Sequence, residues 1–358
     1  MDEREVLERI EARRQRASRR LLDERITLAH GAGGRSSQAL VEALLLPALR
    51  NSLLEPLADA AILELEDGTQ LAFSTDSYVV KPLSFPGGDI ARLAVHGTIN
   101  DLAVSGAQPL ALSARLILEE GLAVAELARY VASLGETARE AGVPIATGDT
   151  KVVERGKADG LYISTSGIGL VAASSKLGAQ EIRSGDRVLL SGTIGDHGMA
   201  VLVARGELEL EGAIESDTAP LHGLVAALLA ACGAAVHCMR DPTRGGVATA
   251  LNELARASRT GIVIDESAIP VAATVAGACE ILGIDPLYVA NEGKLIAIVG
   301  PEVAEVALAT MRAHPLGREA TLIGEIREER PGMVILDTTF GGSRVVDTLA
   351  GDPLPRIC

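Results

Sequence analysis

Residues 61–78, AILELEDGTQLAFSTDSY, predict a β-hairpin. Apolar and polar residues alternate on both sides of Asp67-Gly68, and this dipeptide is a strong signal for a tight turn between antiparallel strands. Asp76 lies just past the second predicted strand. The hairpin therefore places a sheet in the first half of the chain, with an acidic side chain at its end.

On either side of the hairpin, helical and strand patterns alternate along the chain. Asp89 can cap a helix that ends at Gly106, with Pro109 beyond it. The other predicted helices are one over residues 39–49 that is broken at Pro47, one over 123–142, and three that end near Ala204, Gly233 and Ser258. Further strands are predicted at residues 109–118, 143–153, 160–173, 185–192, 261–266, 287–294, 294–300 and 319–326. This alternation predicts two domains of mixed α+β or α/β architecture.

The same patterns divide the chain into four parts. These are a charged, partly helical extension over 1–25, a first domain over 26–177, a second domain over 178–340 and a tail over 341–358. Gly351, Pro353 and Pro355 prevent the end of the tail from forming a helix or a central strand. We therefore expect the tail to be mobile or loosely docked.

Composition excludes several classes of function. The 358 residues include 33 Lys and Arg against 48 Asp and Glu, so the net charge is −15, and aromatic residues make up 2%. An acidic chain with few aromatic rings is poorly suited to binding phosphate backbones or stacked bases, so we expect no nucleic-acid partner. The longest apolar stretch, residues 223–236, is shorter than the roughly 20 residues that span a bilayer, so no membrane segment is expected.

Four cysteines also bear on location and chemistry. None forms a CxxC pair, and four in a chain of this length make no disulfide framework, which favours a reducing cytoplasm. Cys232, Cys238 and Cys279 have Ala, Val and Leu neighbours typical of inert core residues. Cys358 instead ends the predicted tail. It is either an accident of an unstructured end or a carrier thiol on a tether.

A glycine-rich loop is a candidate phosphate-binding segment. The run HGAGGRSS, residues 30–37, contains Gly33 and Gly34 and precedes a helical pattern, which suits an anion. It matches neither the P-loop nor the dinucleotide-binding fingerprint, so, taken alone, a simple connecting loop is the better interpretation. The loops TIGDHG (193–198) and DPTRGG (241–246) have the same ambiguity.

Four aspartates are candidates for holding Mg²⁺ and a nucleotide triphosphate: Asp76, Asp101, Asp149 and Asp241. Each lies at the end of a predicted element, beside small or polar residues such as Asn100 and Thr150. A capping or turn-forming role is commoner for any single aspartate, so this interpretation requires the fold to bring the four together.

Two further residues can act as acid, base or cation. Lys151 and Asp149 are two apart in a predicted strand, so they face the same way and form either part of a site or a surface ion pair. Glu292, in the segment ANEGK, is either an acid or base or an ordinary loop residue.

Eight segments in order resemble the HypE family, the carbamoyl dehydratases of hydrogenase maturation. They are HGAGG (30–34), STDSYVV (74–80), HGTINDLAVSGAQP (96–109), ATGDTKVV (146–153), SGTIGDHGMA (191–200), MRDPTRGG (239–246), NEGK (291–294) and PRIC (355–358). The resemblance implies an aminoimidazole ribonucleotide synthetase-like fold. Its N-terminal ATP-binding domain pairs across a homodimer, and a C-terminal α/β domain follows.

The resemblance also implies a reaction and a site. A carbamoyl group, delivered to Cys358 by HypF, would be dehydrated to a thiocyanate with ATP, and the cyano group would pass to iron on the HypC–HypD complex. The nucleotide would be bound through Gly33, Gly34, Asn100, Thr150 and the four aspartates, which would also bind Mg²⁺. Lys151 would lie near the carboxamide, and Glu292 would act as general base. Nothing in the resemblance extends to residues 1–25.

Two other functions remain open at this stage. A small-molecule kinase of the same superfamily, such as a selenophosphate synthetase, would share the carboxylates and the loop but would have no use for a carrier tail. A non-catalytic carrier or scaffold would use ATP only to order the tail.

Overall fold

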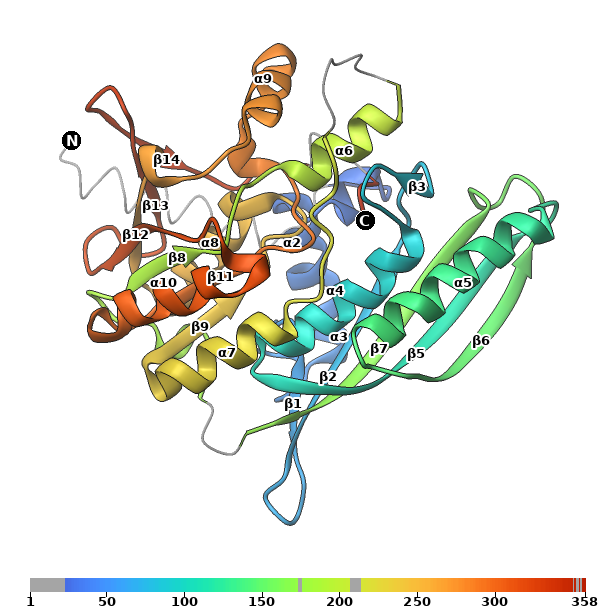
Figure 1. The fold of residues 1–358 in the computed structure, drawn as a ribbon, viewed down its shortest axis with the longest axis horizontal. Coiled ribbons are helices and arrows are strands. Elements are labelled where there is room, and N and C mark those ends of the chain that lie inside the picture. The colour runs from blue at the N-terminus through green and yellow to red at the C-terminus, as the bar shows by residue number, and fades with distance from the viewer. Residues whose placement is uncertain (1–22, 173–175, 207–213, 350, 352–353, 355) are drawn as a thin grey trace.

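Two β-sheets with their covering helices make up the described part of the chain (Figure 1). The computed structural model describes residues 23–172, 176–206, 214–349, 351, 354 and 356–358. Nearly all of the predicted N-terminal extension lies outside the described residues. The mixed architecture predicted for both halves of the chain is confirmed.

The first sheet has five strands in the order β1-β2-β7-β5-β6. They are β1 (Ala61–Glu64), β2 (Gln70–Tyr78), β5 (Ala107–Glu119), β6 (Ile145–Val153) and β7 (Leu161–Val171). The predicted hairpin is present as β1 and β2, with Glu64 opposite Gln70 and Gly68 at a positive φ of 82° in the turn. Only β5 and β6 run parallel, and α5 connects them.

Helices cover one face of this sheet and leave the other open. Helices α4 (Ile90–Val104) and α5 (Val124–Glu140) lie across the inner face in Figure 1. Inward residues of β7 such as Ile163 are buried, whereas Ile168 and Leu170 on the opposite face are each more than 40% exposed. The alternation of the strands thus gives a packed face and an outer face whose exposed apolar side chains no other described residue covers.

The second sheet has seven strands in the order β14-β13-β10-β12-β8-β11-β9. They are β8 (Arg187–Leu190), β9 (Val236–Arg240), β10 (Gly261–Asp265), β11 (Ile296–Val299), β12 (Thr321–Arg327), β13 (Val334–Asp337) and β14 (Ser343–Val346). Its strand β11 is apolar and buried throughout because both faces of the sheet are covered there. Ile296 and Ile298 pack with helix α8, and Ala297 and Val299 pack with α7 and α10.

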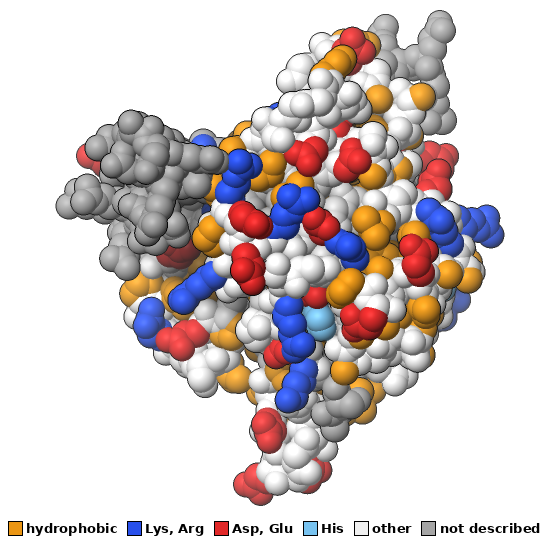
Figure 2. Space-filling view, turned by 90° about the vertical axis from the view of Figure 1, so that its left-hand side faces the viewer, with side chains coloured by type: hydrophobic (Ala, Val, Ile, Leu, Met, Phe, Trp, Pro, Cys, Tyr) orange, Lys and Arg blue, Asp and Glu red, His pale blue; other side chains and the backbone are white. Residues whose placement is uncertain are grey.

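The remaining helices are short. They are α2 (Arg35–Leu40), α3 (Leu46–Leu49), α6 (Asp196–Ala204), α7 (His222–Cys232), α8 (Gly246–Ser258), α9 (Ala273–Leu282) and α10 (Ala304–Ala313). A two-stranded ribbon, β3 (Ser84–Phe85) with β4 (Gly88–Asp89), precedes α4. Within the described ranges, no helix has both the length and the apolarity to cross a bilayer. On the described part of the face in Figure 2, acidic and basic side chains are interspersed with apolar ones.

Helix α4 joins the two sheets. Asp89 caps it as predicted, by accepting hydrogen bonds from the backbone N–H groups of Ala91 and Arg92. Thirteen of its fifteen residues are buried, because its sides pack on the first sheet and its C-terminal turns pack on α7 and β9. Residues on α4 are therefore held by both sheets.

Two predicted elements differ from the structure. Residues 287–294 are not a strand but a short 3₁₀ turn, η6 (Pro286–Tyr288), followed by a buried loop. The Asn291 side chain supplies the hydrogen bonds that a strand partner would otherwise supply, by accepting from the Gly195 N–H and donating to the Pro242 and Val289 carbonyls. An apolar run alone does not distinguish such a buried loop from a strand.

The helix break predicted at Pro47 is wrong. The chain stays helical from Arg35 to Leu49 because a π-helical segment, Val41–Leu45, precedes the proline. The Leu46 N–H donates to the Val41 carbonyl across this wider turn. Pro47 then falls in the first turn of α3, where its missing N–H costs little.

The start of the predicted tail also differs. Ser343–Val346 forms strand β14, which pairs antiparallel with β13 at the edge of the second sheet. The described residues after β14 lie outside regular structure.

We expect stability to fall in mild acid because of His96 on α4. This side chain is 2% exposed, its Nδ1 contacts the Thr218 hydroxyl at 3.1 Å, and burial lowers its pKa from 6.5 to about 3. Between these values the unfolded chain binds a proton that the folded chain does not, so the free energy of unfolding falls as the pH falls. At pH 5 the loss from this group is about 2 kcal/mol relative to pH 8.

Urea unfolding of the wild type and of His96→Asn at both pH values tests this. The variant keeps a hydrogen-bonding group near the Nδ1 position but has no proton to gain, so its stability should depend less on pH. Equal pH dependence in the two proteins would contradict the assignment.

Candidate active site

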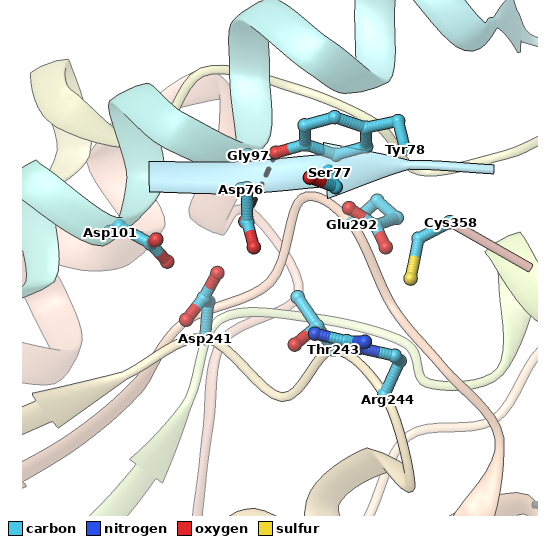
Figure 3. Close-up of a pocket in the computed structure, with 10 residues that line it drawn as sticks. All are labelled: Asp76, Ser77, Tyr78, Gly97, Asp101, Asp241, Thr243, Arg244, Glu292 and Cys358. Carbon is cyan, nitrogen blue, oxygen red and sulfur yellow. Dashed lines mark hydrogen bonds between the residues drawn. The ribbon is translucent and has the colours of Figure 1, made fainter. Parts of the chain in front are cut away.

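Five separate segments converge on one pocket, shown in Figure 3. The lining residues are Asp76, Ser77 and Tyr78 from β2, Gly97 and Asp101 from α4, Asp241, Thr243 and Arg244 after β9, Glu292 before β11, and Cys358. The pocket encloses about 330 Å³ of space, part of it open to solvent. It lies where α4 joins the two sheets, so both halves of the chain contribute to it.

The end of β2 is fitted closely to α4. Asp76 and Tyr78 are two residues apart and face the helix, and the Tyr78 hydroxyl donates to the Asp76 carboxylate at 3.2 Å. Gly97 makes this approach possible, because a Cβ atom there would lie 2.1 Å from the Tyr78 hydroxyl oxygen. The glycine therefore sets the position of the tyrosine and, through it, of Asp76.

Three carboxylates form a compact cluster at one end of the pocket. One oxygen each from Asp59, Asp101 and Asp241 lies within 4.8 Å of the others. Arg240 pairs with Asp59 at 3.1 Å, and the Ser74 hydroxyl donates to Asp101 at 2.5 Å. Oxygen ligands at this spacing suit a hard divalent cation.

The electrostatics of the cluster agree with a cation site. Burial raises the pKa of Asp101, and the charges of Asp76, Asp241 and Asp59 raise it further. Burial and then the charge of Asp59 raise the pKa of Asp241 to about 7. These carboxyl groups therefore resist ionising together, and a bound cation would relieve their repulsion.

Glu292 faces the pocket from a fixed backbone. Its N–H donates to Asp217 at 3.0 Å, and its carbonyl accepts from the Asn100 side chain at 3.2 Å. Its carboxyl is 3% exposed, and among the described residues its Oε1 has no hydrogen-bond partner. Burial, then the charges of Asp241 and Asp217, raise its pKa well above the usual value. A buried carboxyl with a pKa raised in this way is a candidate acid or base.

Arg244 supplies positive charge opposite these acids. The charge of Cys358 is the largest cause that raises its pKa, and Asp76 and Glu292 add to it. Gly33 packs directly on this arginine, with its would-be Cβ only 2.8 Å from the Arg244 Cβ, and the Gly31 carbonyl accepts from the guanidinium. Gly34 follows as the first residue before α2. The predicted glycine-rich loop thus lies against one wall of the pocket.

The described residues near the end of the chain are docked, and they bring Cys358 into the pocket. Leu354 and Ile357 are 3% and 2% exposed, in a cluster with residues of α6 and α9. The Val79 N–H donates to the Cys358 carbonyl at 3.1 Å, and His197 donates from Nε2 to the Ile357 carbonyl at 3.0 Å. Figure 3 shows the sulfur between the Glu292 carboxylate and Arg244.

The structure gathers some of the residues predicted from the sequence and separates others. Asp76, Asp101, Asp241, Glu292 and Cys358 all line the pocket. Asn100 does not line it, because its side chain bonds the backbone of Ala219, Leu221 and Glu292. The hydrogen bonds of Asn100 hold the loop that contains Glu292 against α4.

Asp149, Thr150 and Lys151 lie on the edge strand β6, outside the pocket. The Lys151 Nζ and the Asp149 carboxylate are 3.0 Å apart, and both side chains are more than half exposed. The hydrogen bond from Lys151 lowers the pKa of Asp149. In the single chain this is the surface ion pair that the sequence left open as an alternative.

Five residues at this site were not predicted from the sequence: Asp59, Tyr78, Gly97, Thr243 and Arg244. Tyr78, Thr243 and Arg244 stand inside segments already selected, so extending each candidate to its neighbours would have found them. Asp59 belongs to no such segment, and its place depends on Arg240, which is distant in sequence.

The other cysteines have the inert character predicted for them. Cys232, Cys238 and Cys279 are free and buried, and burial raises the pKa of Cys238 to about 12 and that of Cys279 to about 11. His237 contacts Asp186 at 2.7 Å. Among the described residues the only metal-type cluster is that of Asp59, Asp101 and Asp241.

Comparison with known proteins agrees with this geometry. Residues 57–171 match the N-terminal domain, and residues 183–337 the C-terminal domain, of AIR synthase related proteins. The carbamoyl dehydratase HypE of Rhizobium leguminosarum bv. viciae is 54% identical over 334 residues, which cover 93% of this chain and 95% of that protein. The chain belongs to the HypE family.

Solved HypE structures have the same fold. The HypE of a HypE–HypF complex has a TM-score of 0.82 and 47% identity, covering 87% of this chain and all of that chain. A HypE in complex with ATP has a TM-score of 0.78 and 46% identity, covering 93% of this chain and all of that chain. The aminoimidazole ribonucleotide synthetase-like fold and the HypE resemblance, both inferred from the sequence, are confirmed.

We expect Gly97→Ala to destabilise this HypE-family chain by about 1–3 kcal/mol, because the added methyl group would collide with the Tyr78 hydroxyl. In a Tyr78→Phe background, which lacks that oxygen, the same change should cost less, since alanine otherwise favours a helix interior over glycine. Urea unfolding of the four proteins measures the coupling. Equal costs in both backgrounds would show that the hydroxyl contact does not set the fit.

Proposed function

We propose that the chain dehydrates a carbamoyl group carried on Cys358 to a thiocyanate, at the expense of ATP. The observation that carries this proposal is the presence of the Cys358 thiol, the unpartnered Glu292 carboxyl and the aspartate cluster in one pocket. The name and the ATP complex of close relatives support it. The product would supply the cyanide ligand for iron during [NiFe] hydrogenase maturation.

The reaction balances with ATP as the acceptor of the amide oxygen. The oxygen of the carboxamide on the Cys358 sulfur attacks the γ-phosphorus, ADP leaves, and the amide nitrogen gives up one of its two protons, which ends on the phosphate product. The resulting phosphorylated imidate then loses its N–H proton while the carbon–oxygen bond breaks. The products are S–C≡N, ADP, phosphate and one proton. Phosphate thus replaces hydroxide as the leaving group.

Glu292 is our choice for the general base. In its ionised form, its raised pKa makes it a stronger base than an ordinary carboxylate, and its backbone is fixed by Asp217 and Asn100. Arg244 is placed to neutralise charge that develops near the sulfur-bound group. In this proposal the proton acceptor, Glu292, and the cation, Arg244, lie on opposite sides of the reacting carbon.

The cation site fits Mg²⁺. Asp59, Asp101 and Asp241 offer three oxygen ligands, and Asp76 lies beside them. Bound there, Mg²⁺ would neutralise charge on the ATP phosphates. We add Asp59 to the aspartates inferred from the sequence, and we propose that Gly33 and Gly34 contribute backbone to the nucleotide site.

A homodimer accounts for the open face of the first sheet and for the residues of β6. Phe73, Ile168 and Leu170 expose 45%, 42% and 41% of their surface there. A second copy that covers this face would bury these side chains, which stabilises association. We propose that Asp149, Thr150 and Lys151 complete the pocket of the partner copy, where Lys151 would stabilise the carboxamide oxygen.

Two partners follow from the proposed reaction. HypF would load the carbamoyl group, which is supported by a HypE relative solved in complex with HypF. The HypC–HypD complex would receive the cyano group. We place these steps in the cytoplasm, as the cysteine content indicates.

Intact mass spectrometry after loading by HypF tests the function. We expect a carbamoyl adduct on the peptide that contains Cys358, and loss of one water from that adduct only with Mg²⁺ and hydrolysable ATP. Cys358→Ala should take no adduct. The Glu292→Gln variant should accept the carbamoyl group normally but dehydrate it about 10²–10³ times more slowly, because general base catalysis typically contributes a rate factor of this size.

The other outcomes discriminate between functions. An adduct that persists while ATP binds without hydrolysis would favour a carrier or scaffold. ATP turnover with a small acceptor in Cys358→Ala would favour a kinase.

Thermal unfolding tests the cation site without any turnover. At a cation concentration about ten times Kd, Mg²⁺ should stabilise the chain by about 1.4 kcal/mol. Asp59→Asn should lose this stabilisation, since one of three ligands is gone, whereas Asp67→Asn in the exposed hairpin turn should keep it. Equal Mg²⁺ stabilisation in both variants would reject the site.

A further inference from the structure

Lys81 and Arg356 are linked in three ways close to Cys358. The Lys81 N–H donates to the Arg356 carbonyl at 3.3 Å. The Arg205 guanidinium, at the end of α6, donates from Nε to the Lys81 carbonyl at 2.8 Å and from Nη2 to the Arg356 carbonyl at 2.6 Å. The Asp159 carboxylate contacts the Lys81 ammonium at 3.0 Å and the Arg356 guanidinium at 2.5 Å. The Arg205 guanidinium thus bonds two backbone carbonyls, and the Asp159 carboxylate pairs with two cationic side chains.

This group, called the latch below, comprises Lys81, Asp159, Arg205 and Arg356. It acts on the docked segment two residues before Cys358, where the chain lies antiparallel to residues 79–81. Because the Arg356 carbonyl is fixed, the next two residues have little freedom. The latch therefore sets how deeply the Cys358 sulfur enters the pocket.

The ion-paired side chains of the latch are partly exposed to solvent, which favours its opening. Asp159 and Arg356 are about one-third and one-quarter exposed, and the Lys81 side chain is 60% exposed. The hydrogen bond from Lys81 is the largest cause that lowers the pKa of Asp159, so the carboxylate is charged at neutral pH. Ion pairs at such exposure are individually weak and are screened by salt. The two Arg205 bonds are charge-assisted and stronger.

We propose that Asp159 and Arg205 are positioning residues that hold Cys358 in the pocket for dehydration and release it for loading. The proposal rests on the proposed function of Cys358. Neither residue touches the reacting atoms. Their effect is on the fraction of chains whose sulfur is in place.

A residue with this role has opposite effects on two steps. The carbamoyl donor must reach the thiol outside the pocket, so a weaker latch speeds loading. Dehydration needs the sulfur beside Glu292, so a weaker latch slows it. Ordinary structural damage would slow both steps.

The first test measures docking without catalysis. The unloaded chain is pulsed with iodoacetamide in the absence of ATP, and alkylation of Cys358 is quantified by peptide mass spectrometry, with the buried cysteines as internal reference. We expect alkylation to rise roughly five-fold in Asp159→Asn and about ten-fold or more in Arg205→Met. Salt near 1 M should raise alkylation of the wild type more than that of Asp159→Asn.

The second test measures the two steps separately on the full chain. With HypF, the latch variants should load at least as fast as the wild type. After loading, ATP-dependent loss of water should be slower in proportion to the decrease in the fraction of chains whose Cys358 is docked. The KM for ATP should be unchanged. Arg205→Lys, which keeps the charge but reaches one carbonyl, should lie between the wild type and Arg205→Met.

Glu140→Gln is the matched control, because it breaks an exposed ion pair with Arg92 away from the pocket. It should behave as the wild type in every assay. Alkylation of Cys358 at the wild-type rate in both latch variants would overturn the proposal, as would slower loading together with slower dehydration. If the wild type alkylates as expected but never loses water from its adduct, the proposed function fails while the docking role stands.

Discussion

The burial of several carboxylates around one helix is the constraint on which the site depends. Asp59, Asp76, Asp101 and Asp241 share a small volume in which their charges repel and in which burial disfavours ionisation. Such an arrangement persists only if rigid surroundings hold it. Helix α4 provides these rigid surroundings, because it packs on the first sheet along its length and on the second domain at its end. Its Asn100 also fixes the loop that bears Glu292.

The two sheets contribute differently to this arrangement. The second sheet is apolar on both faces and supplies rigid loops at its strand ends, from which Asp241, Arg244 and Glu292 extend. The first sheet is packed on one face only, and its β2 strand delivers Asp76 and Tyr78 to α4. The same side chains could not be fixed by either sheet alone, because each supplies only part of the pocket wall.

Local patterns in the sequence predicted what local physics determines. The Asp67-Gly68 turn and the Asp89 cap were found correctly because each depends on a few adjacent residues. Asp59 was missed because its position follows from a partner far along the chain, Arg240. Residues 287–294 differ from the predicted strand because their apolar run hides the hydrogen bonds made by Asn291. Residues 149–151 form the predicted strand, but pairing within one chain does not bring them to the pocket.

The docked end of the chain has a kinetic consequence. If Cys358 carries the reacting group as proposed, that group is attached to the protein that transforms it, so its encounter with Glu292 is intramolecular and has an effective molarity instead of a dissociation constant. Dilution of the protein leaves that encounter unchanged. In the proposed reaction, each chain would carry a single acceptor thiol that must be emptied before it can react again. The chain would then work in stoichiometric rounds, which could not be faster than the opening of its own terminal segment.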